Sequence, residues 1–286
     1  MIMSPQTPVL FVTWRSPKTH SIIPVGRLIY RDDKLYEFAY INKAQEAVHQ
    51  GFMPFLDFPY LGQFYLSHQL FPLFANRVLP VNRPEFREYI GALGLSQENA
   101  DPMHILARTG GRRETDQIEM FPLPFPDPQT GAFVTHCLIR GIRYMPQPIV
   151  EDRIAGLRPQ EPLFLLWDAQ NKQDPAALAV RTGDYVLVGY LPAYLNREMW
   201  ELLASCPQCQ VSVERVNPPP AGVHHRLLCR VDGCWPEGYI PFSTVDYQPI
   251  NTDATDLRQW FEGQTVLASE NSPKSTPGSV VVSSKT

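Results

Sequence analysis

Three short apolar runs near the middle of the chain constrain its fold more than any other feature. They span residues 163–167, 177–180 and 185–190. Each has the length of a β-strand, and turn-forming Asp, Asn, Pro and Gly residues separate them. An Arg-Thr-Gly-Asp turn at 181–184 joins the last two runs. The pattern predicts a small antiparallel meander within a strand-rich fold.

The loop between the first two runs carries three polar residues at a spacing of three: Asp168, Asn171 and Asp174. Asp and Asn commonly hydrogen-bond to their own backbone in turns, and the residue types alone favour this structural role. The alternative is a binding site, because strands on both sides would hold the loop in place.

This loop belongs to a longer pattern. The pattern begins with Arg140-Gly-Ile-Arg-Tyr144 and continues with Asp168-Ala-Gln-Asn-Lys-Gln-Asp-Pro-Ala-Ala-Leu-Ala-Val180. It then has Val188-Gly-Tyr-Leu-Pro192 and runs into Tyr194-Leu-Asn196. The three motifs, in this order, resemble the HIRAN domain. The resemblance covers roughly residues 133–240 and implies an OB-like β-barrel.

The same resemblance implies non-catalytic binding of single-stranded DNA, with free 3′-hydroxyl ends as the expected ligand. The family's functional positions fall on Arg143, Tyr144, Asn171, Asp174 and Tyr190. Arg143 would pair with a phosphate, and the two tyrosines would stack on bases or sugars. Asn171 would bond to a base edge or a sugar oxygen. Asp174 would accept a hydrogen bond from a 3′-hydroxyl and repel a phosphate.

Some positions depart from the family pattern and leave a second function open. Met145 and Gln173 stand where aromatic residues often occur, and Pro175-Ala176 replaces a more polar pair. Each stacked base contributes roughly 1 to 3 kcal/mol, so the loss of two aromatic surfaces would weaken binding. The alternative is a protein-interaction module without DNA binding, whose partner would be a DNA-processing or defence protein.

Charge limits the kind of nucleic-acid contact that the chain can make. The formal net charge is −4, and residues 1–129, 130–240 and 241–286 each carry fewer Lys and Arg than Asp and Glu. Broad contact with a duplex needs an excess of Lys and Arg. A nucleic-acid ligand should therefore be a few nucleotides held in a pocket.

Residues 1–119 are expected to form a small α+β domain. Alternating apolar residues predict a strand at 9–14 and a hairpin made of 25–30 and 35–40. Helical spacing predicts short helices at 44–50 and 83–93. A third helix should begin at Asp101-Pro102 and end at Gly110, because Asp is a favoured N-cap and Pro a favoured first residue.

Three elements of this part resemble the N-terminal subdomain of HipA-like proteins. They are Val25-Gly-Arg-Leu28, Phe74-Ala-Asn-Arg-Val-Leu-Pro80 and the helix that ends in glycine at 105–111. The resemblance implies fold and ancestry only, because no phosphate-cradling loop or kinase motif follows.

A non-enzyme is the expected outcome, since the chain carries no recognised catalytic motif. His224-His225 with Asp168 and Asp174 is the nearest approach to an acid–base set. Adjacent histidines on a strand would point to opposite faces, so one site could not use both easily.

The proline-rich stretch at 120–131 is expected to be a linker. An ordered extended edge is its alternative, because Phe121, Leu123 and Phe125 are apolar. The HIRAN-like barrel with a C-terminal extension would then occupy 132–265, with a brief helix at 257–261, and 266–286 has the composition of a disordered tail.

Two cysteine pairs raise the question of a metal. Cys206, Cys209, Cys229 and Cys234 have a separation that can hold tetrahedral zinc. The second pair is loosely spaced, however, and Cys229 lies in an apolar run, which favours a buried thiol. We therefore expect no cofactor, with zinc as the alternative, and a core position for Cys137.

The chain shows no apolar run of membrane-spanning length and no secretory type of N-terminus. We therefore expect a cytoplasmic protein without a membrane partner.

Overall fold

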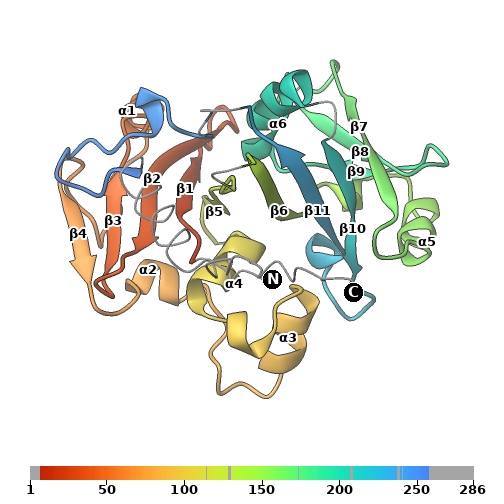
Figure 1. Ribbon diagram of the computed structural model, residues 1–286, viewed down its shortest axis with the longest axis horizontal. Coiled ribbons are helices and arrows are strands. Elements are labelled where there is room, and N and C mark those ends of the chain that lie inside the picture. Colours follow the sequence, from red (N-terminus) through yellow and green to blue (C-terminus); the bar gives the residue numbers. More distant parts are fainter. Residues whose placement is uncertain are drawn as a thin grey trace, which may run out of the picture. The chain divides into compact units, whose positions relative to one another are not determined.

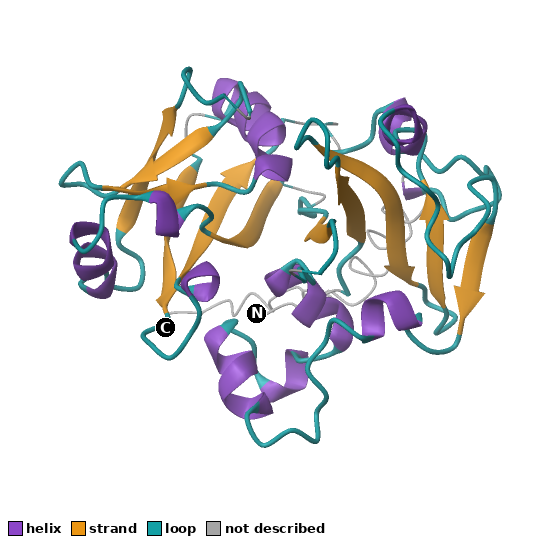
Figure 2. Cartoon of the chain, turned by 180° about the vertical axis from the view of Figure 1, so that it is seen from behind, coloured by secondary structure: helices purple, strands orange, loops and turns teal. Residues whose placement is uncertain are grey.

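The computed structural model describes residues 7–113, 115–127, 130–172, 174–206, 209–236, 239 and 241–257. Within these ranges the chain is mainly β, as the sequence predicted, with two antiparallel sheets and short helices (Figures 1 and 2). The expected tail lies outside the described residues, as does all of the brief helix at 257–261 except Leu257. No helix in the described part is long and apolar enough to cross a bilayer.

The first sheet has the strand order β4-β3-β2-β1-β5. The predicted strand and hairpin of the N-terminal part are confirmed as its central strands. Phe38 lies at the centre of its aromatic core and stacks on Phe58 at 4.1 Å between ring centroids. The strands are β1 (Leu10–Arg15), β2 (Ile22–Tyr30), β3 (Tyr36–Tyr40), β4 (Phe64–Ser67) and β5 (Ile118–Pro122).

Short helices accompany this sheet, and α4 shows why they begin and end where they do. The Asp101 carboxylate accepts hydrogen bonds from the backbone N–H groups of Met103 and His104, which confirms the predicted cap. Gly110 ends the helix in the left-handed conformation. The helices are α1 (Ala44–His49), α2 (Pro72–Ala75), α3 (Phe86–Ala92), η1 (Gln97–Asn99) and α4 (Pro102–Thr109).

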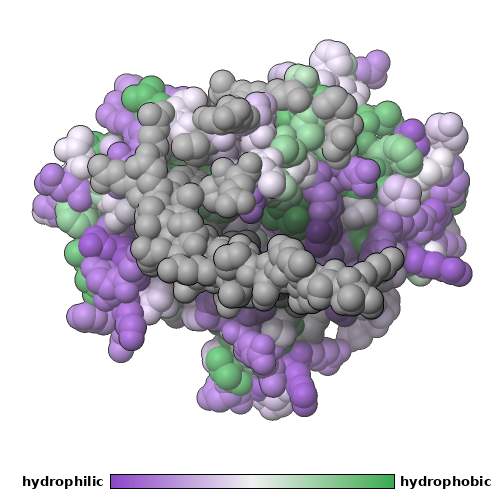
Figure 3. Space-filling view, viewed as in Figure 1, coloured by the Kyte–Doolittle hydropathy of each residue, from purple (hydrophilic) through white to green (hydrophobic). Residues whose placement is uncertain are grey.

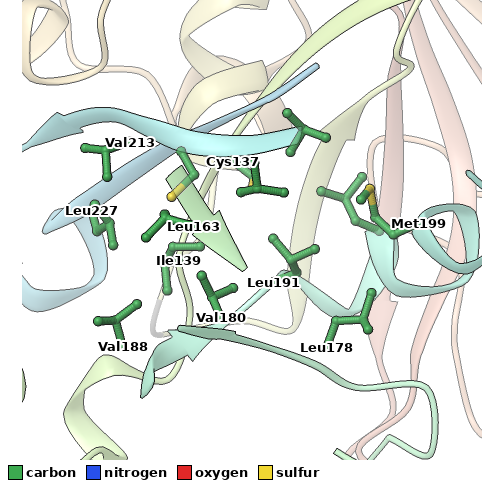
Figure 4. Close-up of a cluster of buried hydrophobic side chains, with 14 of the residues drawn as sticks. Cys137, Ile139, Leu163, Leu178, Val180, Val188, Leu191, Met199, Val213 and Leu227 are labelled. Carbon is green, nitrogen blue, oxygen red and sulfur yellow. The ribbon is translucent and has the colours of Figure 1, made fainter. Parts of the chain in front are cut away.

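The second sheet has the order β6-β11-β10-β7-β8-β9, and its last three strands confirm the predicted meander. Apolar side chains from these strands and from α6 converge on one core (Figure 4). The strands are β6 (Ala132–Leu138), β7 (Pro162–Trp167), β8 (Leu178–Arg181), β9 (Leu187–Tyr190), β10 (Gln210–Val216) and β11 (Leu227–Cys234). The helical segments are η2 (Ile142–Tyr144), α5 (Ile149–Ala155), α6 (Ala193–Ser205) and η3 (Val223–His225).

The two edges of this sheet meet at one pair of residues. Arg140, just after β6, and Tyr190, at the end of β9, exchange two backbone hydrogen bonds of 2.9 Å. We call this pair the seam. It curls the antiparallel sheet toward the barrel that the sequence implied.

Two motif glycines make the seam possible. Gly189 has φ +149°, and a Cβ there would lie 2.4 Å from the Arg140 carbonyl oxygen. Gly141 has φ +74°, and its Cβ would lie 3.3 Å from the Tyr190 ring. A side chain at either position would separate the edges or strain the backbone.

The proline-rich stretch and a segment near the C-terminal end of the described chain both contact strand β1 of the first sheet. Met120–Pro122, part of the proline-rich stretch, pair with β1 as an ordered edge, which is the second of the two interpretations offered for this stretch. Farther on, Phe242 lies 5.4 Å from Phe11 and 5.1 Å from Phe121 between ring centroids. Residues up to Ala254 form one compact unit. The division into domains at 1–119 and 132–265 stays a prediction.

Candidate nucleic-acid interface

The five residues expected to bind DNA line a single cleft of about 1110 Å³. They are Arg143, Tyr144, Asn171, Asp174 and Tyr190. In the sequence they belong to three separate motifs, and the seam brings these motifs together, because Gly141 and Tyr190 lie on its two sides. The space-filling view shows a hydrophilic group beside apolar residues near the middle of the molecule (Figure 3).

Arg143 and Tyr144 stand on the exposed turn η2, directly after the seam. The Tyr144 N–H donates to the Gly141 carbonyl at 2.9 Å, which fixes the turn. The Arg143 guanidinium lies 4.7 Å from the centre of the Tyr144 ring and also donates to its hydroxyl. The Tyr144 side chain is 72% exposed. In the described part of the chain Arg143 has no carboxylate partner, so its charge is available to an anion.

The polar loop does hold its own backbone, as the structural interpretation predicted. The Asp174 N–H donates to Asn171 Oδ1 at 3.1 Å, and the Ala176 N–H donates to Asp174 Oδ1 at 2.9 Å. Both side chains nevertheless line the cleft. The turn and a binding role for Asp174 are therefore compatible, since its carboxylate keeps acceptor lone pairs beyond this bond.

Asp168, which does not line the cleft, positions one of its aromatic residues. The Tyr190 hydroxyl donates to Asp168 Oδ2 at 2.9 Å. Burial, together with this hydrogen bond, raises the pKa of Tyr190 above its usual value. The ring is thus held as a neutral surface on which a base or sugar can stack.

Asn196 on α6 is a cleft residue at the end of the sequence pattern, to which no role was assigned from the sequence. Its Nδ2 donates to Asp174 Oδ2 at 2.7 Å, and because a carboxylate only accepts, this contact fixes the orientation of the amide. The remaining oxygen, Oδ1, is buried without a hydrogen-bond partner among the described residues. Asn196 thus holds the Asp174 carboxylate in place, and the carboxylate can accept a hydrogen bond from a donor on a ligand.

The cleft is rich in positive charge although the chain is acidic. Glu119 is already paired with Arg140, and Asp174 bonds to the amide of Asn196. The positive surplus comes from both halves of the chain, which explains why segment-by-segment charge counting could not detect it. The cations among the described lining residues are Arg15, Arg77, Arg112, Arg140, Arg143 and Lys172, and the carboxylates are Glu119 and Asp174.

The prediction that His224 and His225 could not easily share one site is corrected by the structure. They lie in the 3-10 turn η3 and not on a strand, so both line the cleft, with 4.3 Å between ring centroids. Burial, His224 and Arg140 lower the pKa of His225 to about 4. His225 is therefore neutral near pH 7 and adds no positive charge to the cleft.

The cysteines considered for zinc are dispersed. Cys229 is fully buried and faces Cys137 across β11 and β6. Burial raises the pKa of Cys209 to about 12 and that of Cys229 well above its usual value. The exposed Cys234 thiol donates to the Thr130 carbonyl. No group of three or more potential metal ligands occurs in the described part of the chain.

Comparison with known proteins bears on the second sheet. A family model of the HIRAN domain matches residues 133–233. A protein from Lactobacillus plantarum is 18% identical, with 36% of this chain and 97% of that chain covered and a TM-score of 0.28. The HIRAN domain of human HLTF is 20% identical, with 36% of this chain and 74% of that chain covered and a TM-score of 0.24. The search of curated proteins gave no match.

The match includes all three motifs that line the cleft. HIRAN domains are nucleic-acid-binding, non-catalytic domains. The resemblance inferred from the motifs is therefore confirmed, and residues 133–233 are similar to the HIRAN domain.

Proposed function

We propose that the chain binds the end of a single DNA strand in the cleft and carries out no chemistry on it. The observation that carries this proposal is the meeting of Arg143, Tyr144, Asn171, Asp174 and Tyr190 in one positively charged cleft. The match of residues 133–233 to a family of nucleic-acid-binding domains supports it.

Each side chain has a distinct task in this proposal. Arg143 pairs with a backbone phosphate through its planar guanidinium. Tyr144 and Tyr190 present rings to bases or sugars, and Asn171 bonds to a polar edge. Asp174, with Asn196 behind it, accepts a hydrogen bond from a free 3′-hydroxyl. A phosphate at that position would be repelled by the carboxylate, so ends are preferred to continuous strand.

Fluorescence anisotropy with a labelled single-stranded oligonucleotide tests the proposal. Arg143→Ala should weaken binding by about 1.5 to 3 kcal/mol, because a charge-assisted contact is lost. The slope of log affinity against log salt should fall by about 0.7, the value for one phosphate on a single strand.

Arg158→Ala is the matched control, because Arg158 is exposed, belongs to the same half of the chain and does not line the cleft. Equal binding by the two variants would refute the role of the cleft.

One observation favours the alternative, a protein-interaction module. Phe164, Arg181 and Leu187 are direct neighbours across three strands, and the two apolar side chains are each 41% exposed. Exposed apolar surface of this kind often marks a protein contact. If the wild-type chain binds no single strand, the protein-interaction function becomes the better proposal, with this surface as the contact site.

A further inference from the structure

One wall of the cleft comes from the N-terminal half, to which the HIRAN resemblance assigns no role. Arg15 at the end of β1 and Arg112 after α4 line the cleft. The same two residues also line a smaller hollow of about 120 Å³, together with Arg113. The cleft and the hollow therefore adjoin, because Arg15 and Arg112 line both.

The carboxylates of the hollow are already neutralised. Asp116 accepts two hydrogen bonds from the Arg77 guanidinium, at 3.2 and 2.6 Å. Arg77 also donates to the Gly111 carbonyl at 2.8 Å and is almost completely buried, so it has a structural role. Glu119 is paired with Arg140.

Arg15, Arg112 and Arg113 differ from these paired arginines. None of the three has a carboxylate partner among the residues that the structure describes, and Arg112 and Arg113 are exposed. Unpaired cations along one groove repel one another and raise the local concentration of an anionic ligand. A ligand with regularly repeated negative charges would relieve this repulsion at several points simultaneously.

We infer that Arg15, Arg112 and Arg113 form a phosphate track for the strand whose end lies in the cleft. This inference rests on the proposed function, since the track adjoins the cleft in which the end of the strand would lie. The guanidinium groups bind backbone phosphates and read no base, so the track adds affinity without adding sequence preference. It should act only on strands long enough to pass beyond the end pocket.

The test compares two 5′-labelled oligonucleotides with the same free 3′ end, about four and about twelve nucleotides long, within the span that single-strand-binding folds cover. The full chain carrying both Arg112→Ser and Arg113→Ser should bind the longer strand on the order of tenfold more weakly. Its salt slope on the longer strand should fall by about 1.4, which corresponds to two phosphate contacts. Binding of the shorter strand should weaken much less, because of the two residues only Arg112 also lines the cleft.

Two further variants control for charge and for fold. The double change Arg112→Lys and Arg113→Lys should keep most of the affinity for the longer strand, because the charges remain. Arg87 lies at an exposed position on α3, outside the cleft and the hollow. Arg87→Ser should therefore leave the affinity for both oligonucleotides unchanged. The melting temperature of every variant should match that of the wild type.

The track is overturned if the double Ser variant binds the longer strand as the wild type does, or if it loses both strands equally. If the proposed function itself is wrong, the result differs from both of these, because the wild-type chain would then bind neither strand. That result would remove the end pocket and the track together.

Discussion

At the residue scale, the motif residues were identifiable from sequence but their partners were not. Arg143, Asn171 and Asp174 belong to local patterns whose order is characteristic. The contact between Asp174 and Asn196 joins a loop to a helix, and no local pattern indicates which amide will meet that carboxylate. The same holds for the hydrogen bond between Tyr190 and Asp168. Side-chain pairing across a fold is a product of packing, which the sequence does not display.

Asp174→Asn tests the carboxylate as the acceptor for a 3′-hydroxyl. The new amide can still accept from the Ala176 N–H, but its NH₂ group would face Asn196 Nδ2, so the Asn196 amide should turn its oxygen toward that group. Discrimination between 3′-hydroxyl and 3′-phosphate ends should fall on the order of tenfold, more than overall affinity does, because a like-charge repulsion is lost. Anisotropy with both kinds of end measures the ratio.

Asp152→Asn on the exposed surface of α5 is the control for the loss of one negative charge. An unchanged ratio, or a lower melting temperature as the sole effect, would mean that Asp174 serves only its own turn.

At the scale of elements, the sequence predicted strands, hairpins and a capped helix correctly, because each depends on periodicity or on neighbouring residues. The closing of the sheet at the seam could be anticipated only through the family resemblance. Gly141 and Gly189 were visible as parts of motifs, and the structure supplies the reason for them. Each allows two backbone segments distant in sequence to approach closely.

Gly189→Ala should therefore damage stability and binding together. The added Cβ would lie 2.4 Å from a backbone oxygen, so the seam must open or strain, at a cost of about 1 to 3 kcal/mol. The melting temperature and the affinity for single strands should both fall, because Tyr190 belongs to the seam and Arg143 follows it closely in the chain.

Gly91→Ala is the matched control, since a Cβ at this helical position meets nothing within 4 Å and should be neutral or slightly stabilising. If the two alanine variants unfold at the same temperature, the seam does not depend on Gly189.

At the scale of the whole molecule, the cleft depends on contacts that join distant parts of the chain. Phe121 of β5 stacks on Tyr194 of α6 at 4.5 Å between ring centroids, and Asn217 Nδ2 donates to the Ala92 carbonyl at 3.0 Å. These contacts hold the wall that carries Arg15 and Arg112 against the second sheet. Charge counted along the sequence gave no basic segment, because the cations converge only in three dimensions. The limit of a few nucleotides in a pocket stays a prediction, and the second wall of the cleft could not be foreseen.

The most direct measurement is a competition experiment on the wild-type chain, bound to a labelled single strand with a free 3′-hydroxyl. The competitors are an unlabelled linear strand of identical sequence and the same strand closed into a circle, which has equal phosphates and bases but no terminus. Recognition of an end predicts that the circle competes more weakly, on the order of tenfold or more, which corresponds to about 1.4 kcal/mol. Equal competition by the circle and the linear strand would contradict the account, because the cleft would then bind single strands without regard to their ends.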